Sequence, residues 1–217
     1  MEKNPNKNLL LLGGGGHCRS VLDCALASGE YDRIGIIDTA DRGMIGGIAV
    51  VGTDDDLPRL FEEGWNHAFI TLGSIGRTAV RRRLFDLSRE IGFQIPVIAD
   101  PTAVVSPYAR IGEGTFIAKK AVINAGCRVG RCAILNTGSV LEHDCRTGDF
   151  VHISPGAILC GHVTVGDDSH IGAASVVRQE ITIGSNVLIG IGSVVVSDIP
   201  EGARAYGNPC RPVKQGR

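Results

Sequence analysis

A six-residue repeat runs through the second half of the chain without losing phase. From Val105 to Val195 every sixth residue is aliphatic, and Thr147 is the exception among these 16 positions. A short period of this kind is typical of a β-solenoid, in which each hexapeptide supplies one strand and one turn. Three hexapeptides would complete one triangular coil of about 18 residues, so we predict about five coils stacked roughly 4.8 Å apart.

The composition agrees with a narrow solenoid interior. Aromatic residues make up only 5% of the chain, and Ile and Val fill a small triangular interior better than Phe does. Thirty glycines without a three-residue period exclude a collagen-like chain. Glycine often follows the repeated aliphatic position directly, and we expect these glycines at turns; they are Gly112, Gly130, Gly148, Gly166, Gly172, Gly184 and Gly190.

The first half of the chain has a different pattern, in which apolar strand-like runs alternate with segments of helical spacing. Val21, Leu22, Ala25 and Leu26 mark the apolar face of the first helix. Alternating strands and helices predict a parallel sheet, so we expect a small Rossmann-like α/β domain at residues 1–100 and an all-β solenoid domain with a C-terminal tail at 101–217. The expected strands are 8–13, 33–38, 67–73 and a closing segment at 94–99, and the expected helices are 17–30, 54–64 and 77–93.

Charge and cysteine usage limit the possible environments and partners. The net charge of −1 gives no basic surface for nucleic acid or anionic lipid. The apolar run at 9–12 is too short for a signal peptide or a membrane span, so we expect a cytoplasmic chain that does not insert into membranes. Seven cysteines without a C-x-x-C pattern predict reduced thiols, and Cys145 falls in an inward column, which argues against a cysteine nucleophile.

Four polar residues near the middle of the repeat fall into register when one coil of about 18 residues is added. His152 and His170 should stack, and so should Asp144 and His162. Spacing alone leaves open whether they are catalytic or only decorate a solvent-exposed face.

A glycine-rich turn follows the first predicted strand. Gly13 and Gly15 fit the G-x-G-x-x-G pattern, but Cys18 takes the place of the third glycine. Such a turn brings backbone N–H groups close to phosphate at a helix N-terminus. Asp38 ends the second strand, where a dinucleotide fold binds ribose, so spacing alone permits NAD.

Four segments together resemble the NeuD/PglD-type acyltransferases, and the similarity covers nearly the whole chain. They are "LLGGGGHCRSVLD", "GIID", "INAGCRVGRCAILNTGSVLEHDCRTGDFVHISPGAILCGHVTVG" and "YGNPCRPVK". Members of that family transfer acetyl from acetyl-CoA to nucleotide-linked amino sugars or to sialic acid. The resemblance implies a left-handed parallel β-helix, a homotrimer with active sites between subunits, and CoA lying in the groove between two solenoids.

The resemblance also assigns candidate catalytic residues. His143 matches the general base, and Asp144 matches an acid, usually Glu, that orients it. Neighbours on a strand face opposite ways, so the two can touch only at a turn. The backbone N–H of Gly161 is our candidate oxyanion donor. Asn136 matches an active-site Asn, His152 a histidine beside the thioester, and Ala173 and Ile191 positions whose backbone meets the CoA arm.

Substrate-binding residues are implied in the first domain. Gly15 and His17 are expected near the phosphates or the sugar, and Asp38 and Thr39 near the base or ribose of a nucleotide diphosphate sugar. Gly73 should line the nucleotide pocket, and Arg81 matches a common Arg, although Arg81, Arg82 and Arg83 also fit a solvated helix face. The sequence leaves open whether the nucleotide is UDP or GDP. At the C-terminal tail, Pro209, Arg211 and Lys214 are expected either to cover the adenine of CoA or to be solvated.

The favoured hypothesis is an acetyl-CoA-dependent N-acetyltransferase acting on the 4-amino group of a nucleotide-linked amino-deoxy sugar. O-acetylation of a sialic acid is the alternative, and a non-catalytic nucleotide-sugar or NAD binding module is a third. Carbonic anhydrases of the solenoid type bind zinc through three histidines, but they carry a His-x-x-x-x-His pair that this chain lacks. We therefore expect no metal cofactor.

Overall fold

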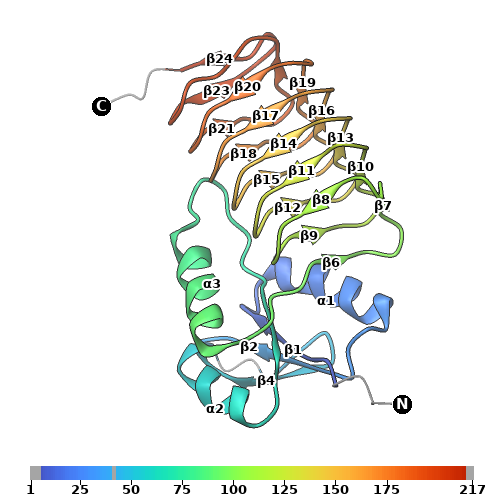
Figure 1. The fold of residues 1–217 in the computed structure, drawn as a ribbon. Coiled ribbons are helices and arrows are strands. Elements are labelled where there is room, and N and C mark those ends of the chain that lie inside the picture. The colour runs from blue at the N-terminus through green and yellow to red at the C-terminus, as the bar shows by residue number, and fades with distance from the viewer. Residues whose placement is uncertain (1–5, 41–42, 214–217) are drawn as a thin grey trace. The chain divides into compact units, whose positions relative to one another are not determined.

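The computed structural model of the chain describes residues 6–40 and 43–213. The chain divides into two compact units (Figure 1). The first contains the residues up to 73 together with 79–101, and the second contains 74–78 together with the residues from 102 onward. The sequence did not predict that 74–78 would pack with the second unit. No helix in the described residues is both long enough and apolar enough to span a bilayer.

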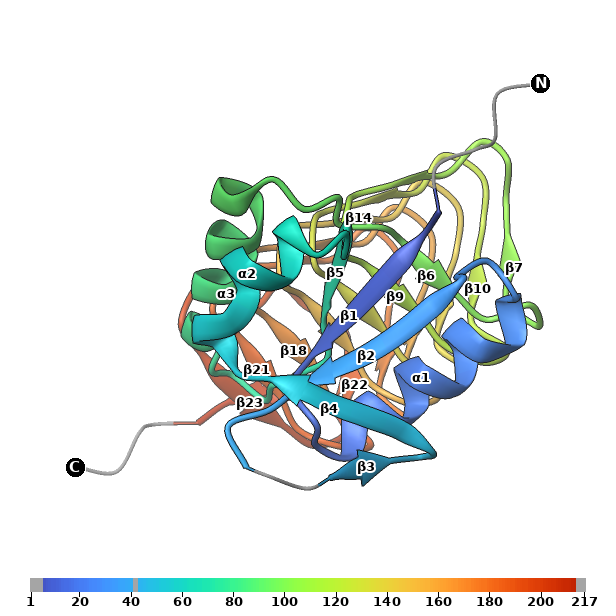
Figure 2. The same cartoon turned by 90° about the horizontal axis from the view of Figure 1, so that it is seen from below.

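The first unit contains a sheet with strand order β3-β4-β2-β1-β5. The pairs β1–β2, β1–β5 and β2–β4 are parallel, as the alternating pattern predicted, whereas β3–β4 is antiparallel. Figures 1 and 2 place α1 on one face of this sheet and α2 on the other. The elements are β1 (Asn8–Leu12), α1 (Gly16–Ser28), β2 (Arg33–Ile37), β3 (Met44–Ile45), β4 (Ile48–Gly52), the 3-10 helix η1 (Asp54–Asp56), α2 (Leu57–Glu62), β5 (His67–Ile70), α3 (Ala79–Ile91) and β6 (Ile98–Ala99).

Local sequence explains most of this unit. The four leucines of β1 at 9–12 are fully buried, and α1, which contacts β1, buries Val21, Leu22 and Ala25. Leu26 is 52% exposed, so the prediction that it belongs to the buried face was wrong. The β3–β4 hairpin was also missed, although its signal is present. Gly46 and Gly47 both have positive φ, as a two-residue type I′ hairpin loop requires.

The second unit is a prism of three parallel sheets, as the repeat predicted. The sheet orders are β22-β19-β16-β13-β10-β7, then β20-β17-β14-β11-β8, and β21-β18-β15-β12-β9 continuing into β23 and β24. Strands β7 to β19 each pair with the strand 18 residues further on, so His152 lies opposite His170. The solenoid strands are β7 (Val104–Val105), β8 (Arg110–Ile111), β9 (Phe116–Ile117), β10 (Val122–Ile123), β11 (Arg128–Val129), β12 (Ile134–Leu135), β13 (Val140–Leu141), β14 (Arg146–Thr147), β15 (His152–Ile153), β16 (Ile158–Leu159), β17 (Thr164–Val165), β18 (His170–Ile171), β19 (Val176–Val177), β20 (Thr182–Ile183), β21 (Leu188–Ile189) and β22 (Val194–Val195).

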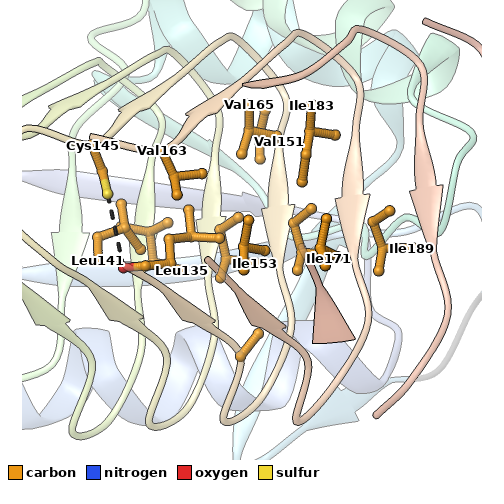
Figure 3. Packing of buried hydrophobic residues seen from close by; sticks show 14 of the residues in the cluster. Leu135, Leu141, Cys145, Val151, Ile153, Val163, Val165, Ile171, Ile183 and Ile189 are labelled. Atoms are coloured by element: carbon orange, nitrogen blue, oxygen red, sulfur yellow. Dashed lines mark hydrogen bonds between the residues drawn. The ribbon is translucent and has the colours of Figure 1, made fainter. Parts of the chain in front are cut away.

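The interior of the prism is the predicted aliphatic column. Each of the 16 repeat positions is the second residue of one of these strands. Leu141, Ile153 and Ile171 are fully buried, and Figure 3 shows them pointing into the core. Val105 at the open first coil is 37% exposed because no coil covers it on that side. Among the described residues every cysteine is free, and Cys160 is the one that is not fully buried.

Turn geometry corrects one expectation. The left-handed turn residue is the third after the aliphatic position: from Gly114 to Gly192 every sixth residue has positive φ, and nine of them are not glycine. The glycines directly after the strands serve a different purpose, because a Cβ there would strike the next coil. At Gly112 an added Cβ would lie 2.6 Å from the carbonyl carbon of Gly130. These glycines permit close stacking rather than the turn itself.

The C-terminal segment closes the last coil. Strand β23 (Arg204–Tyr206) pairs with β21 in parallel, and β24 (Arg211–Pro212) returns antiparallel to it. Cys210 is buried, whereas Pro209 and Arg211 of the predicted tail are exposed. Lys214 lies outside the described residues.

Candidate active site

His143 and Asp144 form the turn between β13 and β14, at an edge of the prism. Asp144 adopts a left-handed conformation with φ of 59°, which turns its side chain back toward its neighbour. The Nδ1 atom of His143 lies 3.0 Å from Oδ2 of Asp144. The sequence predicted that His143 and Asp144 can touch only at a turn, and they do lie at one. Both side chains remain accessible, with exposed fractions of 59% and 49%.

The electrostatics of this pair fit a histidine with an oriented ring. The hydrogen bond with His143 is the largest effect that lowers the pKa of Asp144, and the charges of His162, His143 and Arg146 add to it. Asp144 is therefore a carboxylate at neutral pH, so its oxygen accepts a hydrogen bond from the Nδ1–H group of His143. With the proton on Nδ1, the lone pair of the neutral imidazole is on Nε2.

Gly161, one coil further on, lies directly beside Nε2 of His143. A Cβ built on Gly161 would be 2.5 Å from that nitrogen. Only a residue without a side chain leaves the imidazole in place. No acceptor within the described part of the chain takes the N–H of Gly161, so this donor is available to a ligand beside Nε2.

His162 stacks on Asp144 as the repeat predicted, and its Nε2 lies 3.5 Å from Oδ2 of Asp144. Its ring meets that of His143 edge to face, with centroids 5.3 Å apart. One ligand atom from each of His143, Asp144 and His162 can be chosen so that all lie within 4.8 Å of one another. Over residues 6–40 and 43–213, no other set of three His, Cys, Asp or Glu side chains meets this criterion for a metal ion.

His152 and His170 also stack as predicted, with ring centroids 4.8 Å apart. Nδ1 of His152 lies 3.0 Å from the carbonyl oxygen of Ser74, and a carbonyl only accepts, so Nδ1 carries the proton. Nε2 of His152 then accepts from Nδ2 of Asn136 at 3.2 Å. His170 is buried, which lowers its pKa and keeps it neutral. The hydrogen bonds with Ser74 and Asn136 therefore fix the ring of His152 beside that of His170.

The two histidine pairs lie on different sides of the prism. Strands β13, β14 and β15 belong to three different sheets. His143 lies at the edge where the first two meet, whereas His152 lies on β15 in the third sheet, opposite that edge. The reason is arithmetic: nine residues are half of an 18-residue coil. Within one chain the four imidazoles do not share a groove.

The two residues predicted to contact CoA lie at a third location on the prism. Ala173 lies in the turn between β18 and β19, and Ile191 lies in the turn between β21 and β22, so both are at the edge where these two sheets meet and not at the edge of His143. Ile191 is 81% exposed, although it is a large aliphatic side chain. A single chain thus presents its candidate residues on two edges and one face.

The first unit holds a cavity of about 340 Å³ at the carboxyl ends of β1 and β2. Predicted residues Gly15, Asp38 and Thr39 line it, as do Asp54 and Arg83, which sequence reasoning missed. Arg83 and Asp54 form an ion pair at 2.7 Å. Because a strand and a helix separate them in the sequence, no local pattern predicts that they meet.

Asp38 organises the glycine-rich turn. Its Oδ2 accepts the N–H of Gly14 at 2.8 Å, and its Oδ1 accepts the N–H of Ala40 at 2.9 Å. A Cβ at Gly14 would collide with this carboxylate. Asp38 therefore shapes the turn that faces the cavity, in addition to lining it.

His17, Gly73 and Arg81 lie together beside this cavity but are not among its lining residues. His17 contacts Gly73, since a Cβ there would be 3.5 Å from Cβ of His17. Arg81 is only 2% exposed, so it does not belong to a solvated helix face. Burial, and then the charge of Arg81, lower the pKa of His17 to about 4, which keeps His17 neutral at pH 7.

Burial excludes Cys145 as the nucleophile. Cys145 is fully buried, and its Sγ donates to the carbonyl oxygen of Cys160 at 3.1 Å. Its neighbour Cys127 and burial both raise its pKa. A thiol without access to solvent or substrate is not the nucleophile.

An α/β unit followed by a hexapeptide prism with an exposed His–Asp pair defines a hexapeptide-repeat acyltransferase. Residues 8–87 match the PglD N-terminal domain, and 144–179 match the bacterial transferase hexapeptide (six repeats). The acetyltransferase domain of PglB from Neisseria gonorrhoeae, solved with acetyl coenzyme A, is 38% identical, with a TM-score of 0.91 over 96% of this chain and 100% of that one.

Two other solved structures are also similar to the chain. Perosamine N-acetyltransferase from Caulobacter crescentus, solved with CoA and GDP-perosamine, is 35% identical with a TM-score of 0.91 over 96% of this chain and 97% of that one. WeeI from Acinetobacter baumannii, at 23% identity, 96% and 100% coverage and a TM-score of 0.86, shares the fold. No curated protein sequence matches the chain. The chain belongs to the PglD/NeuD-type sugar acetyltransferases. The predicted fold class, a Rossmann-like α/β domain followed by a left-handed parallel β-helix, is confirmed.

Proposed function

We propose that this protein transfers the acetyl group of acetyl-CoA to the 4-amino group of a nucleotide-linked amino-deoxy sugar. The observation that carries the proposal is the His143–Asp144 pair, with an accessible imidazole whose Nε2 lies beside the free N–H of Gly161. Two relatives support the substrate class: one was solved with acetyl coenzyme A, and the other with CoA and GDP-perosamine.

The proposed chemistry is direct attack without a covalent enzyme intermediate. The neutral amine attacks the thioester carbonyl while Nε2 of His143 accepts the amine proton, a role worth roughly 10²- to 10⁴-fold in rate. Asp144 holds Nδ1 and stabilises the imidazolium. The oxyanion accepts the N–H of Gly161. Collapse of the intermediate expels the CoA thiolate, which takes the proton from His143, so the products are the amide and free CoA.

The placement of the other candidates supports a site shared between two copies of the chain. His152 and Asn136 lie on the sheet opposite the edge of His143, so one thioester can meet both sets only if they come from different subunits. A closed ring of three prisms brings an edge of each against a face of the next. We therefore propose a homotrimer, with His143, Asp144 and Gly161 from one subunit and Asn136 and His152 from its neighbour. Ala173 and Ile191, at an exposed edge, would contact the CoA arm from a neighbouring chain.

The cavity of the first unit supports binding of the sugar nucleotide. The glycine-rich turn precedes α1, a helix of 13 residues. The N–H groups of Gly13 and Gly14 already donate to Ile37 and Asp38, so the N–H groups from Gly15 onward, at the helix start, are the ones that suit a diphosphate. Thr39 and the Asp54–Arg83 pair would contact the base or ribose. His17, Gly73 and Arg81 support this turn from behind.

An acetyl-transfer assay tests the proposal. Release of CoA thiol is measured with UDP- and GDP-linked 4-amino sugars and with sialic acid, using the native chain and His143→Ala. We expect thiol release with one class of 4-amino sugar nucleotide and a loss of at least about 10²-fold in His143→Ala. Release with sialic acid alone would indicate O-acetylation, and release with no acceptor would contradict the proposal.

A further inference from the structure

A three-ligand set for a metal ion lies at the edge of the prism that carries His143. We propose that a first-row divalent cation, Zn²⁺ above all, binds reversibly to His143, Asp144 and His162 and inhibits the enzyme. Binding stands on geometry alone, and inhibition rests on the proposed function. Imidazole nitrogens and carboxylate oxygens are the ligands that zinc and its neighbours take in proteins.

The distances suit a small tetrahedral ion. With metal–ligand bonds of about 2.0–2.2 Å, ligand atoms lie roughly 3.3 Å apart around tetrahedral zinc. Oδ2 of Asp144 is 3.0 Å from Nδ1 of His143 and 3.5 Å from Nε2 of His162. One ligand atom from each of the three residues lies within 4.8 Å of the others, so side-chain movements of at most about 1.5 Å bring the set to tetrahedral spacing.

The backbone holds these side chains in neighbouring coils. Asp144 and His162 both occupy left-handed turn positions, 18 residues apart, with φ of 59° and 60°. The N–H of His162 donates to the carbonyl oxygen of His143 at 3.0 Å. The ligands are thus pre-arranged by the repeat, because adding one coil places a histidine over an aspartate.

Charge and access also favour a cation. Asp144 supplies a carboxylate oxygen as a ligand, and the nearby basic side chain of Arg146 on β14 is exposed to solvent. All three side chains are about half exposed, so the ion enters without desolvating a buried charge, and water supplies the fourth ligand.

A metal ion bound to Nδ1 of His143 prevents Nε2 of the same ring from acting as the general base. A neutral imidazole carries one proton, so when the metal takes the Nδ1 lone pair the proton resides on Nε2. Nε2 is the nitrogen beside Gly161, and as an N–H it no longer accepts the amine proton. The bound ion also replaces the contact with Asp144 that stabilises the imidazolium.

Two measurements on the full-length chain test the site. Calorimetric titration of metal-free protein with Zn²⁺ should give one strong site per chain. Titration with Co²⁺ should give visible absorption of a tetrahedral nitrogen–oxygen site without thiolate charge transfer. His162→Asn should weaken Zn²⁺ binding by at least the roughly 10- to 100-fold that loss of an outer-shell partner costs. Cys160→Ser, a change at the half-buried thiol, should bind Zn²⁺ like the native chain.

Inhibition is measured separately, as acetyl-CoA consumption by chromatography, with each variant compared with its own metal-free rate. Zn²⁺ should inhibit the native chain and Cys160→Ser at concentrations near the measured Kd, and His162→Asn should need at least tenfold more. Unchanged binding in His162→Asn, a thiolate absorption band with Co²⁺, or no stoichiometric binding would overturn the site. Metal binding with no acetyl transfer to any acceptor would leave the site standing and refute the proposed function instead.

Discussion

Replacing Gly161 by Ala should inactivate the enzyme without unfolding it. An added Cβ would lie 2.5 Å from Nε2 and 2.7 Å from Cε1 of His143, about 1 Å closer than ordinary van der Waals contact at roughly 3.5 Å. The imidazole must therefore move by about 1 Å, and a displacement of that size can cost about 10²-fold in rate. The N–H of residue 161 is retained, so the loss reports on the position of His143 and not on the loss of a donor.

Stability should change little in Gly161→Ala. The φ of Gly161 lies outside the left-handed region, so alanine adopts it without strain, and the group it meets is an exposed side chain that can move. We expect a Tm within about 2 °C of native, corresponding to a change below roughly 0.5 kcal/mol. The control is a double-mutant cycle: in a His143→Ala background, Gly161→Ala should cost no further activity. A fully active Gly161→Ala, or an equal loss in both backgrounds, would refute the placement of His143 beside Gly161.

Three further predictions concern the supporting structure. Asp38→Ala removes the acceptor of two backbone N–H groups, so it should lower the free energy of unfolding by about 2 kcal/mol and raise the KM for the sugar nucleotide, measured by urea denaturation and steady-state kinetics. Ile171→Ala leaves a cavity at a fully buried core position and should lower the free energy of unfolding by about 2–5 kcal/mol. An unchanged free energy of unfolding would mean that the core is not formed. His17 has a pKa lowered from 6.5 to about 4, so below pH 6.5 the unfolded chain takes up a proton that the folded chain refuses. The stability contributed by neutral His17 is present above pH 6.5 and falls as the pH drops toward 4. His17→Gln should flatten that part of the Tm–pH curve, and an unchanged slope would contradict the burial of His17.

The solenoid was predictable because its physics is local and repeated. One aliphatic side chain in six fixes the core column, and the same arithmetic places His170 on His152 and His162 on Asp144. The contact between His143 and Asp144 was predictable only conditionally, because it depends on a left-handed turn at Asp144 that short polar residues adopt more readily than most.

Other features depend on distant contacts that no local pattern carries. The ion pair of Arg83 with Asp54 joins a helix to a turn 29 residues away, and Arg81 is buried where the pattern suggested a solvated face. The opposite placement of His143 and His152 could have been read from the sequence, since nine is half of the 18-residue coil. The chemistry proposed for the candidate residues suggests one group, whereas the fold of a single chain places them on different sides of the prism.

The proposed trimer shares each catalytic centre, with His143 from one chain and His152 from the next. Mixing two inactive variants, His143→Ala and His152→Ala, tests it directly. In randomly reassembled trimers from equal amounts, about a quarter of the sites combine an intact His143 with an intact His152, by the statistics of a closed three-fold ring. If the site is shared, about a quarter of the native rate returns once native mass spectrometry, with one variant isotope-labelled, shows mixed trimers. Mixed trimers with no activity above that of the two separate variants would contradict it.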